Sequence, residues 1–226
     1  MIQSVLDTAA APEEVHVYVR LDSDDCGLAY AEAVGLLSKN NTYGCGLNFY
    51  IGHRPKFLSS AYNELLMISL SPIVGFMADD IQFATKGWDE IVREYFAKQT
   101  VLLLSDSGSP NDPHNVPMHG FVSRRSCQVL GYLLPGFFEH GYADHWMLDV
   151  YRQAGARVVF TDQYRIDHHH FGPEPDKMDA TYQKRSFDRD DKGRTCDDRD
   201  GIVYEFRKAE RKRDAEKLRG LLTCQH

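Results

Sequence analysis

Two adjacent carboxylates follow a short apolar stretch in the first half of the sequence. Residues 72–78 are mostly apolar and have the pattern of a buried strand, and Asp79 and Asp80 come directly after them. Asp24 and Asp25 follow another strand-like stretch in the same way. Carboxylate oxygens bind hard divalent cations, so each pair is a candidate metal site. One pair alone could equally cap a turn, whereas two pairs at one sheet edge favour a binding role.

A run of histidines in the second half could supply further metal ligands. Asp167 is followed by His168, His169 and His170, shortly after a strand-like stretch at 158–160. Histidine nitrogens together with aspartate oxygens favour Mn2+ over Mg2+. Alternate side chains of an extended segment face opposite sides, so we expect His168 and His170 to face the metal and His169 to face away. A solvated histidine run is the alternative.

The apolar residues predict which elements position these groups. A period of two, or a short buried apolar run, predicts strands at 15–21, 45–51, 72–78, 101–104 and 158–160. A period of 3.6 predicts helices at 2–9, 30–37, 58–69, 88–96 and 147–154. This alternation predicts an α/β fold, with a mainly parallel sheet flanked by helices. Ligands of such sheets bind beyond the carboxyl ends of the strands, which is where the acidic pairs fall.

The end of the sequence is rich in charge. Residues 187–201 have little apolar content, and 203–222 fit a charged helix with a thin apolar stripe. We therefore predict one domain over 1–182, a mobile charged loop over 183–202 and a C-terminal helix over 203–226. That helix could be solvated, or it could join two copies in a homo-oligomer.

The composition narrows the class of protein. The formal net charge of -7 argues against bulk electrostatic binding of nucleic acid, although a local basic patch is compatible with it. The five cysteines are scattered without a CxxC pair, which indicates neither a disulfide framework nor a zinc knuckle and favours a reducing compartment. No apolar run reaches the roughly 18 residues of a spanning helix. We therefore expect a cytoplasmic protein without a membrane partner.

Several segments resemble the family 2 glycosyltransferases with the GT-A fold. The similar segments are, in chain order, 61–64 (AYNE), 73–80 (IVGFMADD), 118–124 (MHGFVSR), 141–144 (GYAD), 152–158 (RQAGARV) and 167–170 (DHHH). They resemble the helix and acidic "DxD" strand of that family, its acceptor-side segment, its "ED" helix with the ending R-x-A-G-x-R-V, and its C-terminal histidine strand. The compact layout looks most like the small glycosyltransferases encoded by bacteriophages.

The chain departs from the family pattern in three places. The family's usual first strand is lacking before the helix at 2–9, and that strand helps to wall the nucleobase pocket. Ala78 replaces the first acid of the metal motif, and Ala143 replaces the glutamate before the catalytic aspartate. Each motif keeps its last acid, which is Asp80 in the first and Asp144 in the second.

The resemblance implies a metal-dependent, inverting transfer of a sugar from a nucleoside-diphosphate sugar to an acceptor hydroxyl. Asp80, assisted by Asp79 and by His168 or His170, would hold Mn2+ or Mg2+. Asp144 would be the general base, with the helix N-cap as its alternative role.

The resemblance also implies a donor side and an acceptor side. We favour a UDP-sugar as the donor. The residues expected to bind the donor are Asp22 and Asp24 at the base or ribose, Arg54 and Lys56 at the diphosphate, and Asn63 in support. On the acceptor side we place His119 and Trp146, because an aromatic face can stack on a sugar or a base.

The acceptor and the class of activity have alternatives. A phage-type enzyme could glycosylate hydroxymethylated pyrimidines in DNA, and 203–222 contains seven Lys or Arg against four Asp or Glu. A metal-dependent hydrolase or nuclease would also use Asp and His clusters, but the HExxH pattern is missing. A degenerate, non-catalytic binder of nucleotide sugars is the third possibility, favoured by Ala78, Ala143 and the missing first strand.

Overall fold

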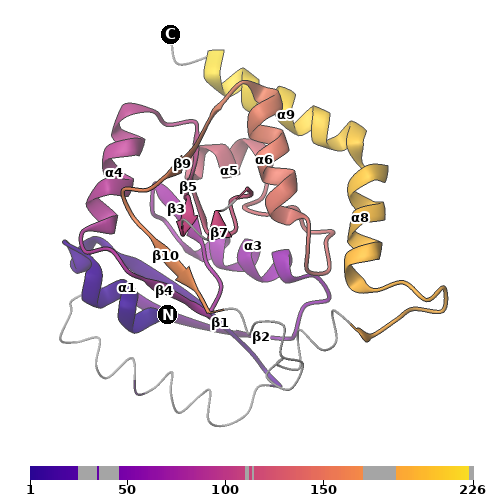
Figure 1. The fold of residues 1–226 in the computed structure, drawn as a ribbon, viewed down its shortest axis with the longest axis horizontal. Coiled ribbons are helices and arrows are strands. Elements are labelled where there is room, and N and C mark those ends of the chain that lie inside the picture. Colours follow the sequence, from indigo (N-terminus) through magenta and orange to yellow (C-terminus); the bar gives the residue numbers. More distant parts are fainter. Residues whose placement is uncertain (25–34, 36–45, 110–111, 114, 170–186, 224–226) are drawn as a thin grey trace.

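A computed structural model describes residues 1–24, 35, 46–109, 112–113, 115–169 and 187–223 (Figure 1). The helices are α1 (Ile2–Thr8), the 3-10 turn η1 (Pro12–Glu14), α3 (Leu58–Ile68), α4 (Trp88–Lys98), α5 (Arg124–Leu130), α6 (Ala143–Ala154), α8 (Cys196–Phe206) and α9 (Lys208–Thr223). The strands are β1 (His16–Asp22), β2 (Gly46–Gly52), β3 (Ile73–Phe76), β4 (Ile81–Phe83), β5 (Leu102–Asp106), β6 (Gly108–Ser109), β7 (Asp112–Pro113), β8 (Gly120–Ser123), β9 (Arg157–Thr161) and β10 (Ile166–His168). The predicted helix at 30–37 lies outside the described residues, apart from position 35.

The central sheet has the strand order β3-β8-β5-β9. β8 runs antiparallel to both of its neighbours, with Val122 opposite Val74 of β3 and Leu103 of β5, whereas β5 and β9 are parallel. Three strands therefore point one way and β8 points the other. The sheet is mixed, with β8 reversed among three strands of one direction. The pattern missed β8 because this strand of four residues is fully buried and shows no alternation.

Two smaller sheets lie beside the central one. β1 and β2 form a parallel pair in which Val17 is opposite Leu47. β10 and β4 form an antiparallel pair in which His168 is opposite Ile81. This second pair matters for the site, because it brings the end of β10 next to the turn that follows β3.

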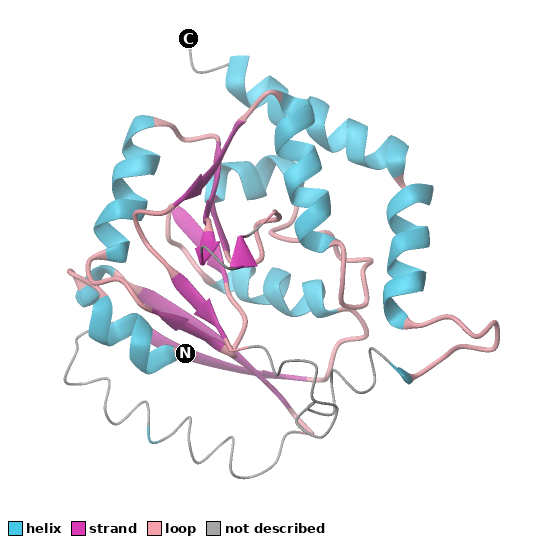
Figure 2. Ribbon diagram, viewed as in Figure 1, coloured by secondary structure: helices cyan, strands magenta, loops and turns pink. Residues whose placement is uncertain are grey.

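Apolar cores lie on both faces of the central sheet, and β5 contributes to each. Leu103 belongs to a core that contains residues of α5, α6 and α9, whereas Leu102 and Leu104 belong to a core that contains residues of α4, β4 and β10. This division follows from the alternation of side chains along a strand. Figures 1 and 2 accordingly show α4 on one side of the central strands and α6 with α9 on the other.

The C-terminal part contains more helix than the sequence predicts. The expected loop over 183–202 contains the first seven residues of α8, which begins at Cys196 after a capping box between Thr195 and Asp198. α9 packs along α6, and its residues Ala215, Leu218 and Leu221 are buried in the core. This part of the apolar stripe is thus covered within the chain, whereas Phe206 at the end of α8 is 86% exposed.

The structure also describes two of the cysteines and the apolar character of the helices. Cys127 and Cys196 are buried free thiols, and the other cysteines lie outside the described residues. Among the helices that the structure describes, none combines the length and apolar character that crossing a membrane requires.

Candidate functional site

Asp80 and His168 meet at the carboxyl end of β3. Asp80 lies in the turn between β3 and β4, and the pairing of β10 with β4 places His168 beside it. Nε2 of His168 is 3.1 Å from both carboxylate oxygens of Asp80. The backbone N–H of His169 also donates to the carbonyl of Asp80 at 2.9 Å, so the end of β10 is fixed at this turn.

His168, the last residue of β10, and His169, which follows it, face different partners. The ring of His169 is exposed and lies 3.1 Å from Oε1 of Gln82, whereas the side chain of His168 is 13% exposed and directed at Asp80. The alternation of an extended segment accounts for this difference. His170 lies outside the described residues.

His119 lies under this pair and not on an open surface. Its side chain is 2% exposed, and its ring meets that of His168 edge-on, with the centroids 4.8 Å apart. The prediction of an acceptor-side role is therefore wrong, because a buried ring offers no face for stacking. Its fixed position just before β8 makes it a support for His168.

Asp79 is exposed and lies next to Asp80 in the same turn. Tyr62 of α3 donates its hydroxyl to the carbonyl of Met77 at 3.0 Å and so holds the backbone ahead of this turn. Burial, followed by the negative charges of Asp79 and Asp80, raises the pKa of Tyr62. The hydroxyl therefore remains a donor at neutral pH.

The Asp80 and His168 pair has a geometry that suits a divalent ion. Two ligand atoms that each lie about 2.1 Å from a metal ion, with a right angle between the two bonds, are about 3 Å apart. The distance of 3.1 Å between Nε2 of His168 and the carboxylate oxygens of Asp80 agrees with this value. In the part of the chain that the structure describes, no group of three or more His, Cys, Asp or Glu side chains is arranged to hold an ion. The pair by itself thus offers two side chains as ligands.

A second polar cluster lies at the end of β1. Arg20, whose side chain is 6% exposed, pairs with Asp22 and donates Nε to Glu64 at 2.8 Å. Arg54 donates to Asp22 and to Asp24, each at 3.0 Å, and its hydrogen bond lowers the pKa of the exposed Asp24 carboxyl. The structure thus brings the predicted residues Asp22, Asp24 and Arg54 together. The sequence did not single out Arg20, because it reads as the ordinary polar residue of an alternating strand.

The other two predicted donor residues differ in their surroundings. Lys56 is exposed, with its ammonium 5.1 Å from the ring centroid of Phe57. The amide of Asn63 is engaged by the chain itself: Oδ1 accepts the N–H groups of Leu133 and Leu134 at 2.8 and 3.2 Å, and Nδ2 donates to the Leu134 carbonyl at 2.8 Å. Asn63 therefore holds α3 to the segment after α5.

Asp144 is the second residue of α6 and not its N-cap. The cap position is Tyr142, and Oδ1 of Asp144 accepts the backbone N–H of His145 at 2.8 Å and lies 2.9 Å from its ring Nδ1. Burial raises the pKa of the Asp144 carboxyl, but the hydrogen bond and positive charge of His145 outweigh it, so the pKa lies below its ordinary value. The same pair raises the pKa of His145. Asp144 is therefore ionised at neutral pH and able to accept a proton.

Trp146 is part of the core, which corrects its predicted acceptor-side role. The side chain is 0% exposed, and its indole N–H donates to the hydroxyl of Tyr132 at 2.9 Å. Phe137 and the guanidinium of Arg211 cover the ring, with centroid distances of 4.9 and 5.2 Å. α9 closes over α6 at this point, so the indole has no surface left for a ligand.

Comparisons with known proteins place this geometry on a known fold. The sequence matches no known protein-family profile, and no curated protein matches it significantly. Among solved structures, the mannosyltransferase PcManGT from Pyrobaculum calidifontis, in complex with GDP-Man and Mn2+, superposes with a TM-score of 0.60 at 16% identity, over 73% of this chain and 51% of that one.

Two more solved structures superpose in the same way. GalNAc-T7 with UDP, GalNAc and Mn2+ gives a TM-score of 0.61 at 10% identity, over 74% of this chain and 40% of that one. S. aureus TarS gives 0.56 at 13% identity, over 73% and 55%. The chain thus spans about half the length of these proteins. The similarity confirms the predicted fold class, an α/β fold of the GT-A type with a C-terminal helix.

Proposed function

We propose that this chain is a metal-dependent glycosyltransferase that moves a sugar from a nucleoside-diphosphate sugar, preferably a UDP-sugar, to an acceptor hydroxyl. The observation that carries the proposal is the meeting of Asp80 and His168 at 3.1 Å beyond the end of β3. The carboxyl ends of strands are where α/β sheets bind their ligands. Solved proteins of the same fold were crystallised with UDP or GDP-Man together with Mn2+.

Asp80 and His168 would hold Mn2+, or Mg2+, with the exposed Asp79 adding negative charge beside them. His170 remains a candidate ligand from the sequence. The ion would offset the charge of the leaving diphosphate, and mixed oxygen and nitrogen ligands favour Mn2+. Because the chain supplies few ligands, we expect the diphosphate oxygens to complete the coordination.

The cluster at the end of β1 would bind the rest of the donor. Asp22 and Asp24 would accept hydrogen bonds from the ribose or base, and the exposed groups of Arg54 and Lys56 would pair with the diphosphate. Arg20 would hold Asp22 in place, since its buried guanidinium bonds to that carboxylate and to Glu64.

Asp144 would act as the general base. The acceptor oxygen attacks the anomeric carbon from the face opposite the diphosphate, and its proton passes to the Asp144 carboxylate. The bond between the anomeric carbon and the diphosphate oxygen breaks, and the electron pair leaves with the diphosphate. A single displacement of this kind inverts the anomeric configuration.

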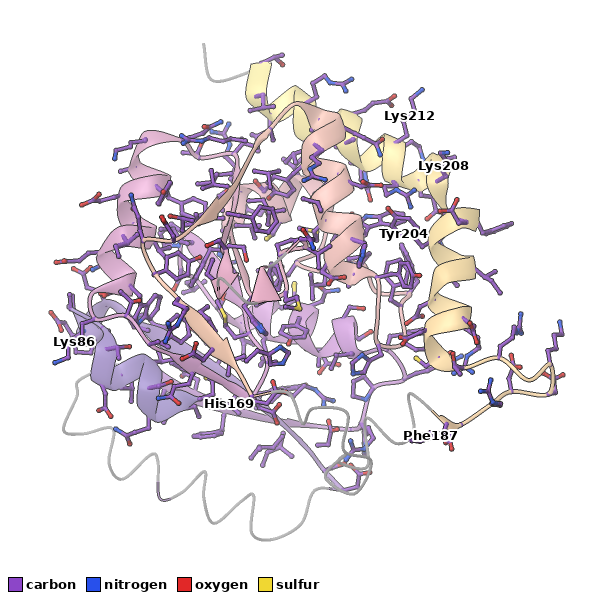
Figure 3. The ribbon with its side chains drawn as sticks, in the orientation of Figure 1. Lys86, His169, Phe187, Tyr204, Lys208 and Lys212 are labelled. Atoms are coloured by element: carbon purple, nitrogen blue, oxygen red, sulfur yellow. The ribbon has the colours of Figure 1, made fainter. Side chains whose placement is uncertain are left out.

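A hydroxymethylated pyrimidine in phage DNA is one candidate acceptor. Two exposed lysines of α9 are compatible with this candidate. Glu210 and Asp214 are engaged within the chain by Arg207 and Lys217, whereas Lys208 and Lys212 lie on the outer side of the helix (Figure 3). Exposed basic side chains on one helix face can contact phosphates.

Cooperative binding of metal and nucleotide tests the proposal. In a thermal shift experiment, Mn2+ and UDP together should raise the melting temperature by more than the sum of their separate effects, because each completes the site of the other. Asp80→Ala should abolish this excess, whereas Asp162→Ala, which removes an exposed carboxylate between β9 and β10, should keep it. The same thermal shift experiment is repeated with GDP in place of UDP. Additive shifts with both nucleotides would contradict the shared site.

A further inference from the structure

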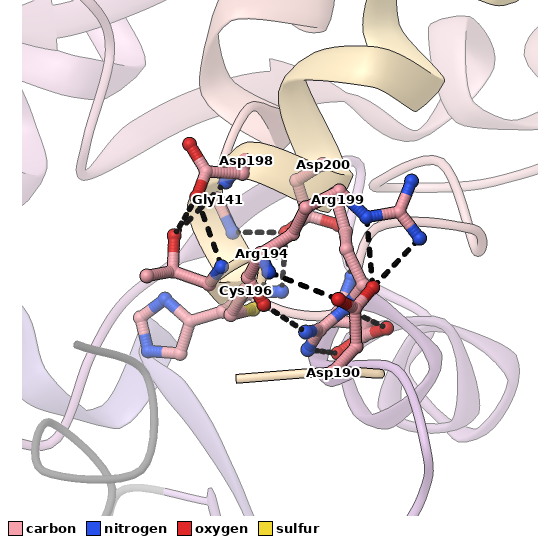
Figure 4. A network of polar contacts seen from close by, with 10 residues as sticks. Gly141, Asp190, Arg194, Cys196, Asp198, Arg199 and Asp200 are labelled. Carbon is pink, nitrogen blue, oxygen red and sulfur yellow. Dashed lines mark hydrogen bonds and ion pairs between the residues drawn. The ribbon is translucent and has the colours of Figure 1, made fainter. Parts of the chain in front are cut away.

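A buried carboxylate from α8 holds the loop that precedes α6. Asp200 is 1% exposed and accepts three consecutive backbone N–H groups, those of residues 139–141, at 2.9, 2.9 and 2.8 Å. The thiol of Cys196, one turn earlier, lies 3.8 Å from the same carboxylate as a weak donor. Figure 4 shows this group of contacts around Gly141 and Asp200. A buried charge is costly unless hydrogen bonds satisfy it, and here consecutive amides do so.

The same loop has a second connection to α8. The guanidinium of Arg199 donates to both carboxylate oxygens of Glu139, at 3.1 and 2.6 Å. The carbonyl of Glu139 accepts the N–H of Leu58 at the start of α3. The loop is therefore tied on one side to α8 and on the other to the helix that follows Arg54 and Lys56.

The loop ends in a strained residue, directly before α6. Tyr142 has φ 62 and ψ -5, and among the described residues it is the only one besides glycine with a positive φ. Such a conformation is unfavourable for a residue with a side chain and persists only where the surroundings enforce it. The ring centroid of Tyr142 lies 5.3 Å from that of Tyr204 on α8. A Cβ added at Gly201 of the same helix would lie 3.2 Å from the hydroxyl oxygen of Tyr142. α8 thus fits closely against Tyr142.

We propose that Asp200 is a positioning residue of the transfer reaction, which fixes the Asp144 carboxylate by holding the backbone of 139–142. Asp144 follows Tyr142 by two residues, so the direction of the first turn of α6 depends on how this loop is held. The inference rests on the proposed function, with Asp144 as the base. It also gives the C-terminal helices a role in the reaction that their charge pattern does not reveal.

Asp200→Asn tests the proposal, because the amide keeps the shape and one acceptor oxygen but turns an N–H group toward the loop amides. We expect the turnover number of Mn2+-dependent donor hydrolysis, with water as the acceptor, to fall about 100-fold, since misplacement of a catalytic group by about 1 Å has an effect of this size. The KM for donor and the joint thermal shift with Mn2+ and UDP should stay as in the wild type. Glu205→Gln, which changes an exposed carboxylate on the same helix, is the matched control and should leave turnover unchanged.

Amide hydrogen exchange gives a readout that does not depend on activity. The amides of 139–141 should lose protection in Asp200→Asn, while those of β5 keep theirs. Wild-type turnover in Asp200→Asn, or a loss of donor binding in parallel with turnover, would overturn the positioning role while leaving the proposed function intact. A wild-type protein that turns over no donor would instead contradict the proposed function itself.

A second variant tests the positioning role of the loop if Asp200→Asn does not fold. Arg199→Gln removes the side-chain connection to Glu139 and leaves the backbone hydrogen bonds of Asp200 in place. Its turnover number should fall about tenfold with an unchanged donor KM. Faster exchange of the 139–141 amides in this variant with an unchanged turnover number would overturn the proposal, because a loosened loop would then leave the reaction unaffected.

Discussion

The imidazole of His168 reaches both carboxylate oxygens of Asp80 at 3.1 Å, although the two residues lie 88 positions apart in the sequence. The pairing of β10 with β4 creates this contact, since it sets His168 opposite Ile81. A shift of one residue in that pairing would turn His169 toward Asp80 instead. The register of a short antiparallel pair therefore decides which histidine can bind a metal.

Histidine substitutions test this register. His168→Ala should lose most Mn2+-dependent turnover and weaken Mn2+ binding, because it removes the nitrogen ligand beside Asp80. His169→Ala should keep most of both, since the ring of His169 faces Gln82. Steady-state rates over a range of Mn2+ concentrations provide the measurement. The opposite pattern, with His169 essential and His168 dispensable, would show that the assignment is wrong.

Asp144→Asn separates catalysis from helix stability. Asp144 follows the cap position by two residues, and an amide oxygen can still accept the N–H of His145, so the melting temperature should stay within a few degrees of the wild type. An amide cannot take up a proton, so turnover should fall by about 100-fold or more. Joint binding of Mn2+ and UDP should survive. Near-normal turnover would exclude Asp144 as the base and direct attention to Glu139 or His145.

The ionisation of His145 reports on the state of Asp144. Its hydrogen bond to Asp144, opposed by burial, raises the pKa of His145 above the ordinary value of about 6.5. An NMR titration of the imidazole should show this elevation in the wild type and a return toward about 6.5 in Asp144→Asn. The stabilisation from the pair is present below the unfolded pKa of His145 and is lost as the pH rises through the raised folded pKa. A pKa that is the same in both proteins would contradict the pairing.

Trp146 should matter for stability and not for recognition of the acceptor. Because its indole is fully buried between α6 and the C-terminal helices, Trp146→Ala should lower the free energy of unfolding by about 3–5 kcal/mol in urea denaturation. Trp146→Phe should lose less, mainly the hydrogen bond to Tyr132. If the folded Trp146→Phe protein showed a strongly raised KM for the acceptor with normal stability, the original acceptor-side assignment would be restored.

Residues at the ends of strands were predictable from the sequence, and contacts between distant elements were not. The positions of β1, β2, β3, β5 and β9 follow from apolar patterns, and Asp80 stands out because acid follows the apolar stretch of β3. His168 stands out as part of a histidine run, but β10, the strand that positions it, was not predicted. The burial of Trp146 depends on α9 closing over α6, which no local pattern encodes. The same holds for His119, whose ring is covered only when β8 lies inside the sheet.

α8 was missed for a related reason. Its first turn contains Asp197 and Asp198, and Asp200 follows, so the segment reads as a solvated loop. In the structure Asp198 belongs to the capping box with Thr195, and Asp200 is buried against the amides of 139–141. Sequence patterns treat a charge as a sign of exposure, whereas here it is satisfied by backbone N–H groups from another part of the chain.

Mass spectrometry of a mixture of nucleotide sugars, incubated with the protein in the presence or absence of Mn2+, tests the central claim most directly. Hydrolysis of the donor needs no knowledge of the acceptor, and it identifies both the nucleotide and the sugar. We predict that one donor of the mixture, a UDP-sugar first, is converted to its nucleoside diphosphate only when Mn2+ is present, and that Asp80→Ala abolishes this conversion. Cooperative binding of Mn2+ and nucleotide without conversion of any donor would instead identify a non-catalytic binder. Conversion that proceeds equally without Mn2+ or in Asp80→Ala would contradict the proposed metal-dependent transferase.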